Sequence, residues 1–126
     1  ESKLGIVKQN QRIKNPPNIR VEPQAAIFTK SKESSIHVIQ NKSPKPIALK
    51  ICSSNNACFK TNANYLVIEP GETFELNVFK CATPEINQKN KLILLFKDLP
   101  SFTKDPVAAM KAPGDQIQLI IPLTVQ

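Results

Sequence analysis

The sequence has no tryptophan, one histidine and only three glycines, and these absences exclude several classes of function. Phosphate-binding loops need glycines at fixed spacing, and Gly5, Gly71 and Gly114 lie too far apart to form one. The single histidine, His37, excludes a multi-histidine metal site and leaves one partner at most for a serine or cysteine nucleophile. We therefore expect no enzyme activity, no cofactor, no metal and no small-molecule substrate.

Disulfide frameworks and membrane-spanning runs are also missing. The cysteines are odd in number and lack C-x-x-C spacing, which favours free thiols in a reducing compartment: Cys52, Cys58 and Cys81. A reactive thiol needs nearby positive charge, such as Lys60 or Lys80, but we expect inert core or rim residues. The longest apolar run, Leu92 to Phe96, is far shorter than the roughly 20 residues that a bilayer requires. We expect a cytoplasmic chain without a membrane anchor of its own.

Positive charge is concentrated at the start of the chain. The formal net charge is +7, and residues 1–20 contribute five basic residues against one glutamate. We expect residues 1–17 to be a basic leader and order to begin near Asn18, after Pro16-Pro17. The leader is either a solvated terminus or an arm for acidic proteins, nucleic acid or anionic membrane. Because the lysines are not interleaved with aromatic residues, no specific nucleic-acid binding is expected.

What the sequence does contain is a series of short alternating segments separated by turn residues, among them eleven prolines. Clear period-two alternation occurs at Ile47–Ile51, Phe74–Val78 and Ile117–Leu123. Seven or eight such segments predict one domain at residues 18–126. Its predicted fold is all-β, an immunoglobulin-like sandwich of seven antiparallel strands.

Local patterns give more detailed expectations. Ile36 and Val38 alternate with His37, which predicts an exposed or partly exposed histidine. The continuous run Lys91–Lys97 predicts a central strand covered on both faces. Pro122 predicts a sheet edge or a bulge, because proline has no backbone donor. Residues 105–111 predict a short helix with an N-cap aspartate.

Three motifs follow one another in an order typical of a known family. One strand ends in Asn41-Lys42-Ser43, the next ends in Cys52-Ser53-Ser54, and Ile68-Glu69-Pro70-Gly71 forms a turn. This order resembles the major sperm protein domain, which has Asn-x-Ser or Asn-x-Thr, a Lys-Thr-Thr-like step and an Ile-x-Pro-Gly-like turn. Residues 91–100 are similar in spacing to its penultimate strand, and residues 105–119 resemble its small sperm-specific branch. The resemblance implies the same seven-stranded sandwich.

The resemblance also implies a structural function. Roundworm sperm proteins of this family form symmetric dimers and assemble into filaments that drive cell crawling. Their small relatives are sperm-restricted accessory proteins. By resemblance we expect a non-enzymatic cytoskeletal or filament-accessory protein of sperm, which forms a homodimer or assembles with a related filament protein.

A second branch of the family implies an alternative function. The vesicle-associated-membrane-protein-associated proteins bind acidic peptides with two phenylalanines at membrane contact sites. Their binding positions correspond here to Ser53, Ser54 and Lys91, with Lys50 as a further cation. The first lysine of the motif is replaced by Cys52 and a methionine by Ile93, so weaker capture of an acidic peptide is expected.

Overall fold

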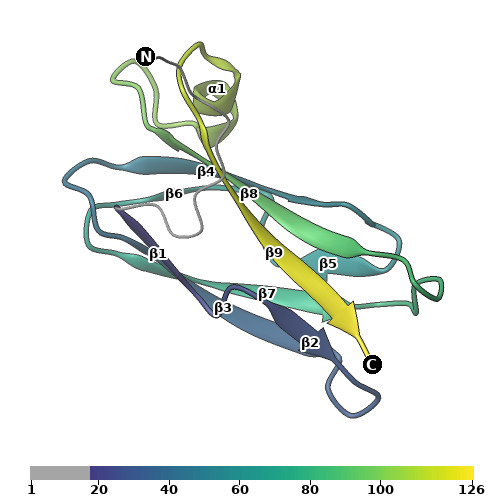
Figure 1. Cartoon of the computed structure of the whole chain (residues 1–126). Helices are drawn as coiled ribbons and strands as arrows, with labels where there is room; N and C mark the ends of the chain where they lie inside the picture. Colours follow the sequence, from purple (N-terminus) through teal and green to yellow (C-terminus); the bar gives the residue numbers. More distant parts are fainter. Residues whose placement is uncertain (1–17) are drawn as a thin grey trace, which may run out of the picture.

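Two β-sheets packed face to face form the domain, as the computed structural model describes it for residues 18–126 (Figure 1). The strands of the four-stranded sheet are, in spatial order, β1 (Ile19–Glu22), β3 (Ser34–Asn41), β7 (Thr73–Lys80) and β5 (Phe59–Thr61). The strands of the five-stranded sheet are, in spatial order, β2 (Ala26–Phe28), β9 (Ile117–Val125), β8 (Asn90–Asp98), β4 (Ile47–Ser53) and β6 (Tyr65–Ile68). The predicted leader, residues 1–17, lies outside the described residues.

The predicted β-sandwich is confirmed, but the described part of the chain has nine strands rather than seven. The first strand is divided between the sheets: β1 pairs with β3, and after Pro23 the chain crosses over so that β2 pairs with β9. The β2–β9 pair is parallel, whereas the other described strand pairs are antiparallel. Very short strands such as β5 also raise the count. The three residues of β5 are too few to show an alternation from which a strand could be predicted.

The core lies between the inner faces of the two sheets. Its largest side chains include Phe28 and Phe59, whose ring centroids lie 5.4 Å apart, and Phe96. Full burial of one such side chain stabilises a fold by about 1.5–3 kcal/mol. Strand β8 lies between β4 and β9, so its predicted central position is confirmed. Its outer face is covered only in part, because Lys91 is exposed and Ile93 and Leu95 are half-buried. On one side of β9, Pro122 pairs with Lys91 of β8. On the other side, the pairing with β2 begins only at the next residue, Leu123, so Pro122 lies at a sheet edge there, as predicted.

The prediction for His37 was wrong. His37 is fully buried, whereas Ile36 and Val38 are about half exposed on the outer face of the four-stranded sheet. Directly opposite residues in an antiparallel pair share a face, and β3 pairs His37 with the buried Leu76 of β7. The unambiguous alternation of β7 therefore decides which face of β3 points inward.

A buried asparagine fixes the turn between β3 and β4. Asn41 Nδ2 donates hydrogen bonds to the carbonyl oxygens of Lys45 (2.8 Å) and Ile68 (2.9 Å). Asn41 Oδ1 accepts from the backbone N–H of Ser43 (2.9 Å) and from its hydroxyl (2.7 Å). All four bonding positions of the amide are used, so the Asn-Lys-Ser turn has a structural role that ties β3 to the end of β6.

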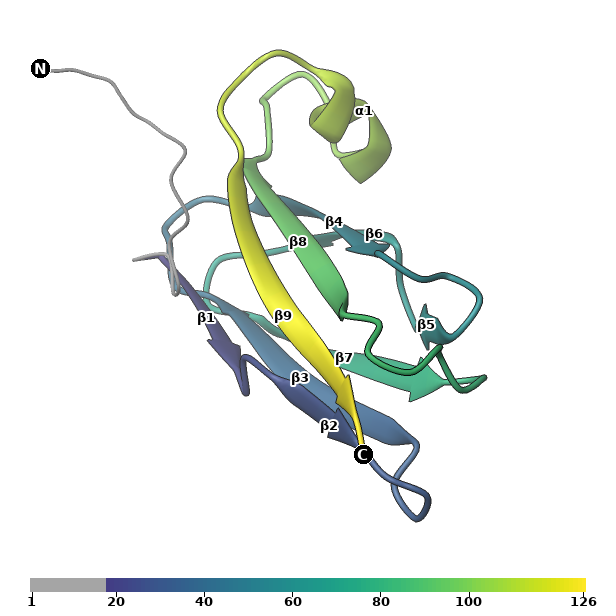
Figure 2. The same cartoon turned by 45° about the vertical axis from the view of Figure 1, so that its right-hand side comes forward.

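The short helix α1 (Pro106–Lys111) lies at the end of the sandwich where β8 ends and β9 begins (Figure 2). Asp105 caps it, as predicted, by accepting a hydrogen bond from Val107 N at 3.0 Å. Ala109 and Met110 pack against Ala48 and against partly buried side chains on the outer face of the five-stranded sheet. Lys97 is buried beneath the helix, and its Nζ donates to the carbonyl oxygen of the C-cap residue Ala112.

Candidate functional site

The four residues implied by the family resemblance lie near one another but not all on one face. In the register of β4 against β8, Lys50 pairs with Leu95 and Ser53 pairs with Leu92. Leu92 is buried in the core, so Ser53 belongs to the inner face of the sheet. Because side chains alternate along a strand, Lys50 and Ser54 share the outer face, which Lys91 of β8 shares as well.

We call this surface the β4/β8 face and define it by Lys50, Cys52, Ser54, Lys91 and Ile93. Its two lysines are separated by about four residues along the strands, which corresponds to roughly 13 Å. Cys52 and Ile93, both half-buried, form a cross-strand pair between them. An extended peptide with separated acidic groups would match this spacing.

Several of these polar groups already have partners within the chain. Ser54 Oγ accepts a hydrogen bond from Lys91 N at 2.9 Å, and Ser54 N donates to Lys91 O at 2.9 Å. Ser53 Oγ accepts from Asn55 N at 3.1 Å. The Lys50 ammonium lies 5.7 Å from the centroid of the Tyr65 ring, within cation–π range. The Lys91 ammonium, on an exposed residue, is thus the group of this face best placed to meet an anionic partner.

Sequence reasoning missed an apolar surface on the opposite side of the molecule. Ile36, Val38 and Phe79 are 50%, 42% and 42% exposed, and all three belong to the outer face of the four-stranded sheet. Ile36 pairs with Asn77, so Phe79 is its diagonal neighbour on the adjacent strand. We call this surface the β3/β7 patch. The alternation of Ile36 and Val38 carries this signal in the sequence, but the expectation of an exposed His37 placed the outer face on the other side of the strand.

The inner side of the same strand carries the polar residues Ser35, His37 and Asn41 together with the buried Ile39. His37 Nδ1 lies 2.7 Å from the carbonyl oxygen of Pro23, and Nε2 lies 2.9 Å from the hydroxyl of the buried Ser35. Burial lowers the pKa of His37, the nearby Lys32 charge lowers it further, and the bond to Pro23 opposes this shift. A strand that buries histidine and serine while exposing isoleucine and valine is the reverse of what stability alone favours. This inversion leaves apolar side chains uncovered on the outer face of the four-stranded sheet.

Residues 18–126 contain no cluster of side chains suited to binding a metal ion. That part of the chain contains no group of three or more His, Cys, Asp and Glu side chains that could hold a metal ion. All three cysteines are free: Cys58 is buried, Cys52 is half-buried and Cys81 is exposed. None of the described helices is long and apolar enough to cross a membrane.

Two packed sheets with this strand order define an immunoglobulin-like β-sandwich domain. Within that class, the model of the MSP (Major sperm protein) domain matches residues 18–117. The chain belongs to the major sperm protein domain family, as the motif order implied.

Known proteins support the same assignment. The chain is 26% identical over 103 residues to sperm-specific class P protein 31 of Caenorhabditis elegans, covering 82% of this chain and 94% of that protein. Its fold is similar to WR4, a C. elegans MSP family member, with a TM-score of 0.76, 24% identity and coverage of 86% and 98% of the two chains. It is also similar to SSP-19, an MSP-domain-like protein of the same organism, with a TM-score of 0.67, 23% identity and coverage of 82% and 97%. These relatives agree with the predicted sperm-specific branch.

Proposed function

We propose that this protein is a non-enzymatic component of the sperm cytoplasm that pairs with itself or with a related filament protein through the β3/β7 patch. The observation that carries the proposal is the inverted strand β3, which exposes Ile36 and Val38 beside Phe79 while His37 is buried. Similarity to sperm-specific class P proteins supports the cellular setting.

Removal of the patch from water supplies the free energy of association. Each of the three side chains keeps about half of its surface exposed, and covering that surface contributes about 25 cal/mol per Å². Arg20 and Glu22 lie beside the patch on β1 and form an exposed ion pair of 3.1 Å, so the apolar centre has a charged margin. An apolar centre with a polar margin is the usual anatomy of a protein interface.

Sedimentation tests this proposal directly. The full chain should sediment faster as its concentration rises to high micromolar values, or it should cosediment with assembled filaments of a related major sperm protein. A chain that stays monomeric at those concentrations and stays in the supernatant with filaments would exclude the assembly function.

A second candidate function is the binding of acidic two-phenylalanine peptides on the β4/β8 face. The observation that favours it is the shared outer face of Lys50, Ser54 and Lys91. Titration with such a peptide should give binding that weakens as salt rises, because the attraction comes from the two lysines. The variant Lys91→Glu should remove it. Absence of heat and of chemical-shift change at millimolar peptide would reject this function.

A further inference from the structure

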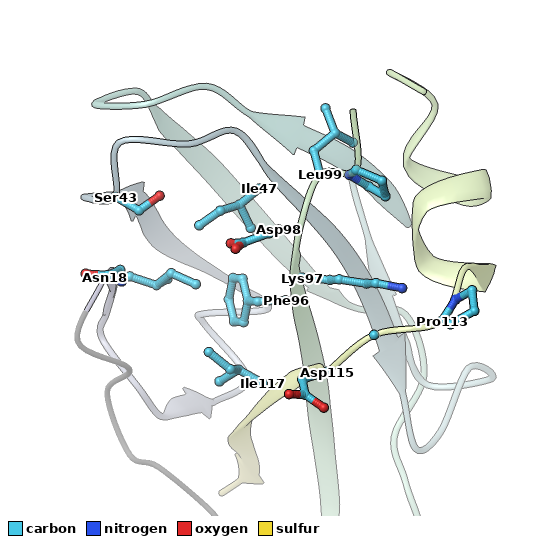
Figure 3. A pocket seen from close by; sticks show the side chains of 13 residues that line it. Asn18, Ser43, Ile47, Phe96, Lys97, Asp98, Leu99, Pro113, Asp115 and Ile117 are labelled. Carbon is cyan, nitrogen blue, oxygen red and sulfur yellow. The ribbon is translucent and has the colours of Figure 1, made fainter. Parts of the chain in front are cut away.

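One end of the sandwich is hollow. A cavity of about 490 Å³ lies where β1 and β4 begin, β8 ends and β9 begins. Ile47, Phe96 and Ile117 follow one another along it, as Figure 3 shows. Ile47 and Phe96 belong to the buried core, whereas Ile117 is 37% exposed, so the cavity opens an apolar surface to the outside. We call it the end hollow.

Carboxylates mark the rim of the end hollow. Asp98 and Asp115 line it, both are exposed, and neither forms an ion pair within residues 18–126. The neighbouring Lys97 does not neutralise them by an ion pair, because its Nζ donates to Ala112 O and its side chain extends toward Pro113 (Figure 3). An apolar cavity with two carboxylates at its rim suits an apolar side chain that has cations on both sides.

We propose that the end hollow binds the segment Arg12-Ile13-Lys14 of the same chain. Ile13 is the apolar residue of the leader that has a basic residue directly on each side. Leu4 and Val7 each have a single adjacent lysine and lie farther from the domain, and Ile6 has none. The isoleucine fills the hollow while Arg12 and Lys14 approach Asp98 and Asp115.

The covalent connection supports binding within one chain. Asn18, to which the leader is joined, lines the end hollow itself, and its carbonyl oxygen accepts a hydrogen bond from Lys42 N at 2.8 Å. Ile13 lies five residues before Asn18, and five extended residues span about 17 Å, which is enough to reach across the cavity. A tether this short gives an effective concentration on the order of millimolar, so a weak contact is sufficient.

Four trypsin cleavage sites in the leader can report this contact. Trypsin cleaves after Lys3, Lys8, Arg12 and Lys14, so one time course on the full chain, read by mass spectrometry, compares all four sites. Binding of the segment should slow cleavage after Arg12 and Lys14 by about tenfold, because proteolysis follows the population of the released form. The double variant Asp98→Asn/Asp115→Asn should restore these rates, as should Ile13→Ser. Cleavage after Lys3 and Lys8 should stay unchanged.

The matched control is Glu75→Gln/Glu85→Gln, which removes two exposed carboxylates far from the end hollow in sequence and should leave the protection in place. Equal cleavage rates in the parent and the Asp98→Asn/Asp115→Asn chain would overturn the proposal. So would protection that persists in both Asp98→Asn/Asp115→Asn and Ile13→Ser. Protection that increases with protein concentration would assign the hollow to the leader of a second copy and would equally overturn binding within one chain. This inference does not depend on the β3/β7 patch, so the two proposals can fail separately.

Discussion

His37 Nδ1 lies 2.7 Å from the carbonyl oxygen of Pro23, and this contact joins the middle of β3 to the point where the chain leaves β1 for β2. The crossing between the two sheets is therefore held by a buried imidazole. The second ring nitrogen is occupied by the hydroxyl of Ser35 at 2.9 Å. A neutral imidazole satisfies both contacts when Nδ1 donates and Nε2 accepts.

The first prediction concerns pH. Burial and Lys32 lower the pKa of His37 below its ordinary value of 6.5, so the folded state favours the neutral ring. Above pH 6.5 the contribution of His37 to stability is complete. As the pH falls below 6.5, the unfolded chain binds a proton that the folded chain resists. The free energy of unfolding therefore decreases until the pH has passed the lowered pKa of the folded state.

Urea unfolding between pH 7.5 and 5.5 measures this effect. Because His37 is the single histidine, no other side chain with an ordinary pKa titrates in this window. The slope should reach at most about 1.4 kcal/mol per pH unit in the parent and should be nearly absent in His37→Gln. Equal slopes in the two proteins would show that His37 is not the responsible group.

The second prediction concerns the turn between β3 and β4. In Asn41→Asp, a carboxylate oxygen replaces the amide that donates to Lys45 O and Ile68 O, so a buried negative charge faces two carbonyl oxygens. The loss should be on the order of 3–5 kcal/mol in the free energy of unfolding at pH 7. The exposed Asn56→Asp should stay within about 0.5 kcal/mol. Similar losses in both variants would contradict the structural role of the turn.

The third prediction compares two glycines with positive φ. Gly71 has φ +80° and open space around the position of an added Cβ, whereas Gly114 has φ +137° and Lys97 Cε only 3.1 Å from that position. Gly71→Ala should cost about 1 kcal/mol from the backbone alone. Gly114→Ala should cost more, because Lys97 must also move away from Ala112. Thermal unfolding of both variants decides the order, and a smaller loss at Gly114 would refute it.

Much of the fold could be predicted from the sequence, because β7 and β9 show strong alternation and proline or glycine separates most segments. The faces of β3 could not. Ile36 and Val38 alternate as clearly as Ser35, His37, Ile39 and Asn41, and the pattern alone favours placing Ile36 and Val38 inside. The fold instead follows Leu76 and Val78 across the strand pair, together with the hydrogen bonds of Asn41. Pairing between distant segments cannot be read from one segment's pattern.

The candidate site was predictable in part. Family resemblance gave Lys50, Ser53, Ser54 and Lys91, and strand register separates Ser53 from the other three. The β3/β7 patch was not predicted, because Ile36 and Val38 lie on the face opposite His37, and His37 was the side chain expected to be exposed. The end hollow joins residues from β1, β4, β8 and β9, which are far apart in the sequence and meet only in the folded domain.

The central claim, that the β3/β7 patch mediates assembly, is tested most directly by sedimentation of matched variants. Ile36→Lys/Phe79→Lys places two charges in the patch, and Ile27→Lys places one at a 49% exposed isoleucine of the other sheet. The account predicts self-association or cosedimentation with filaments in the parent and in Ile27→Lys, and its loss in the double variant with unchanged thermal unfolding. Undiminished association of the folded double variant would contradict the claim.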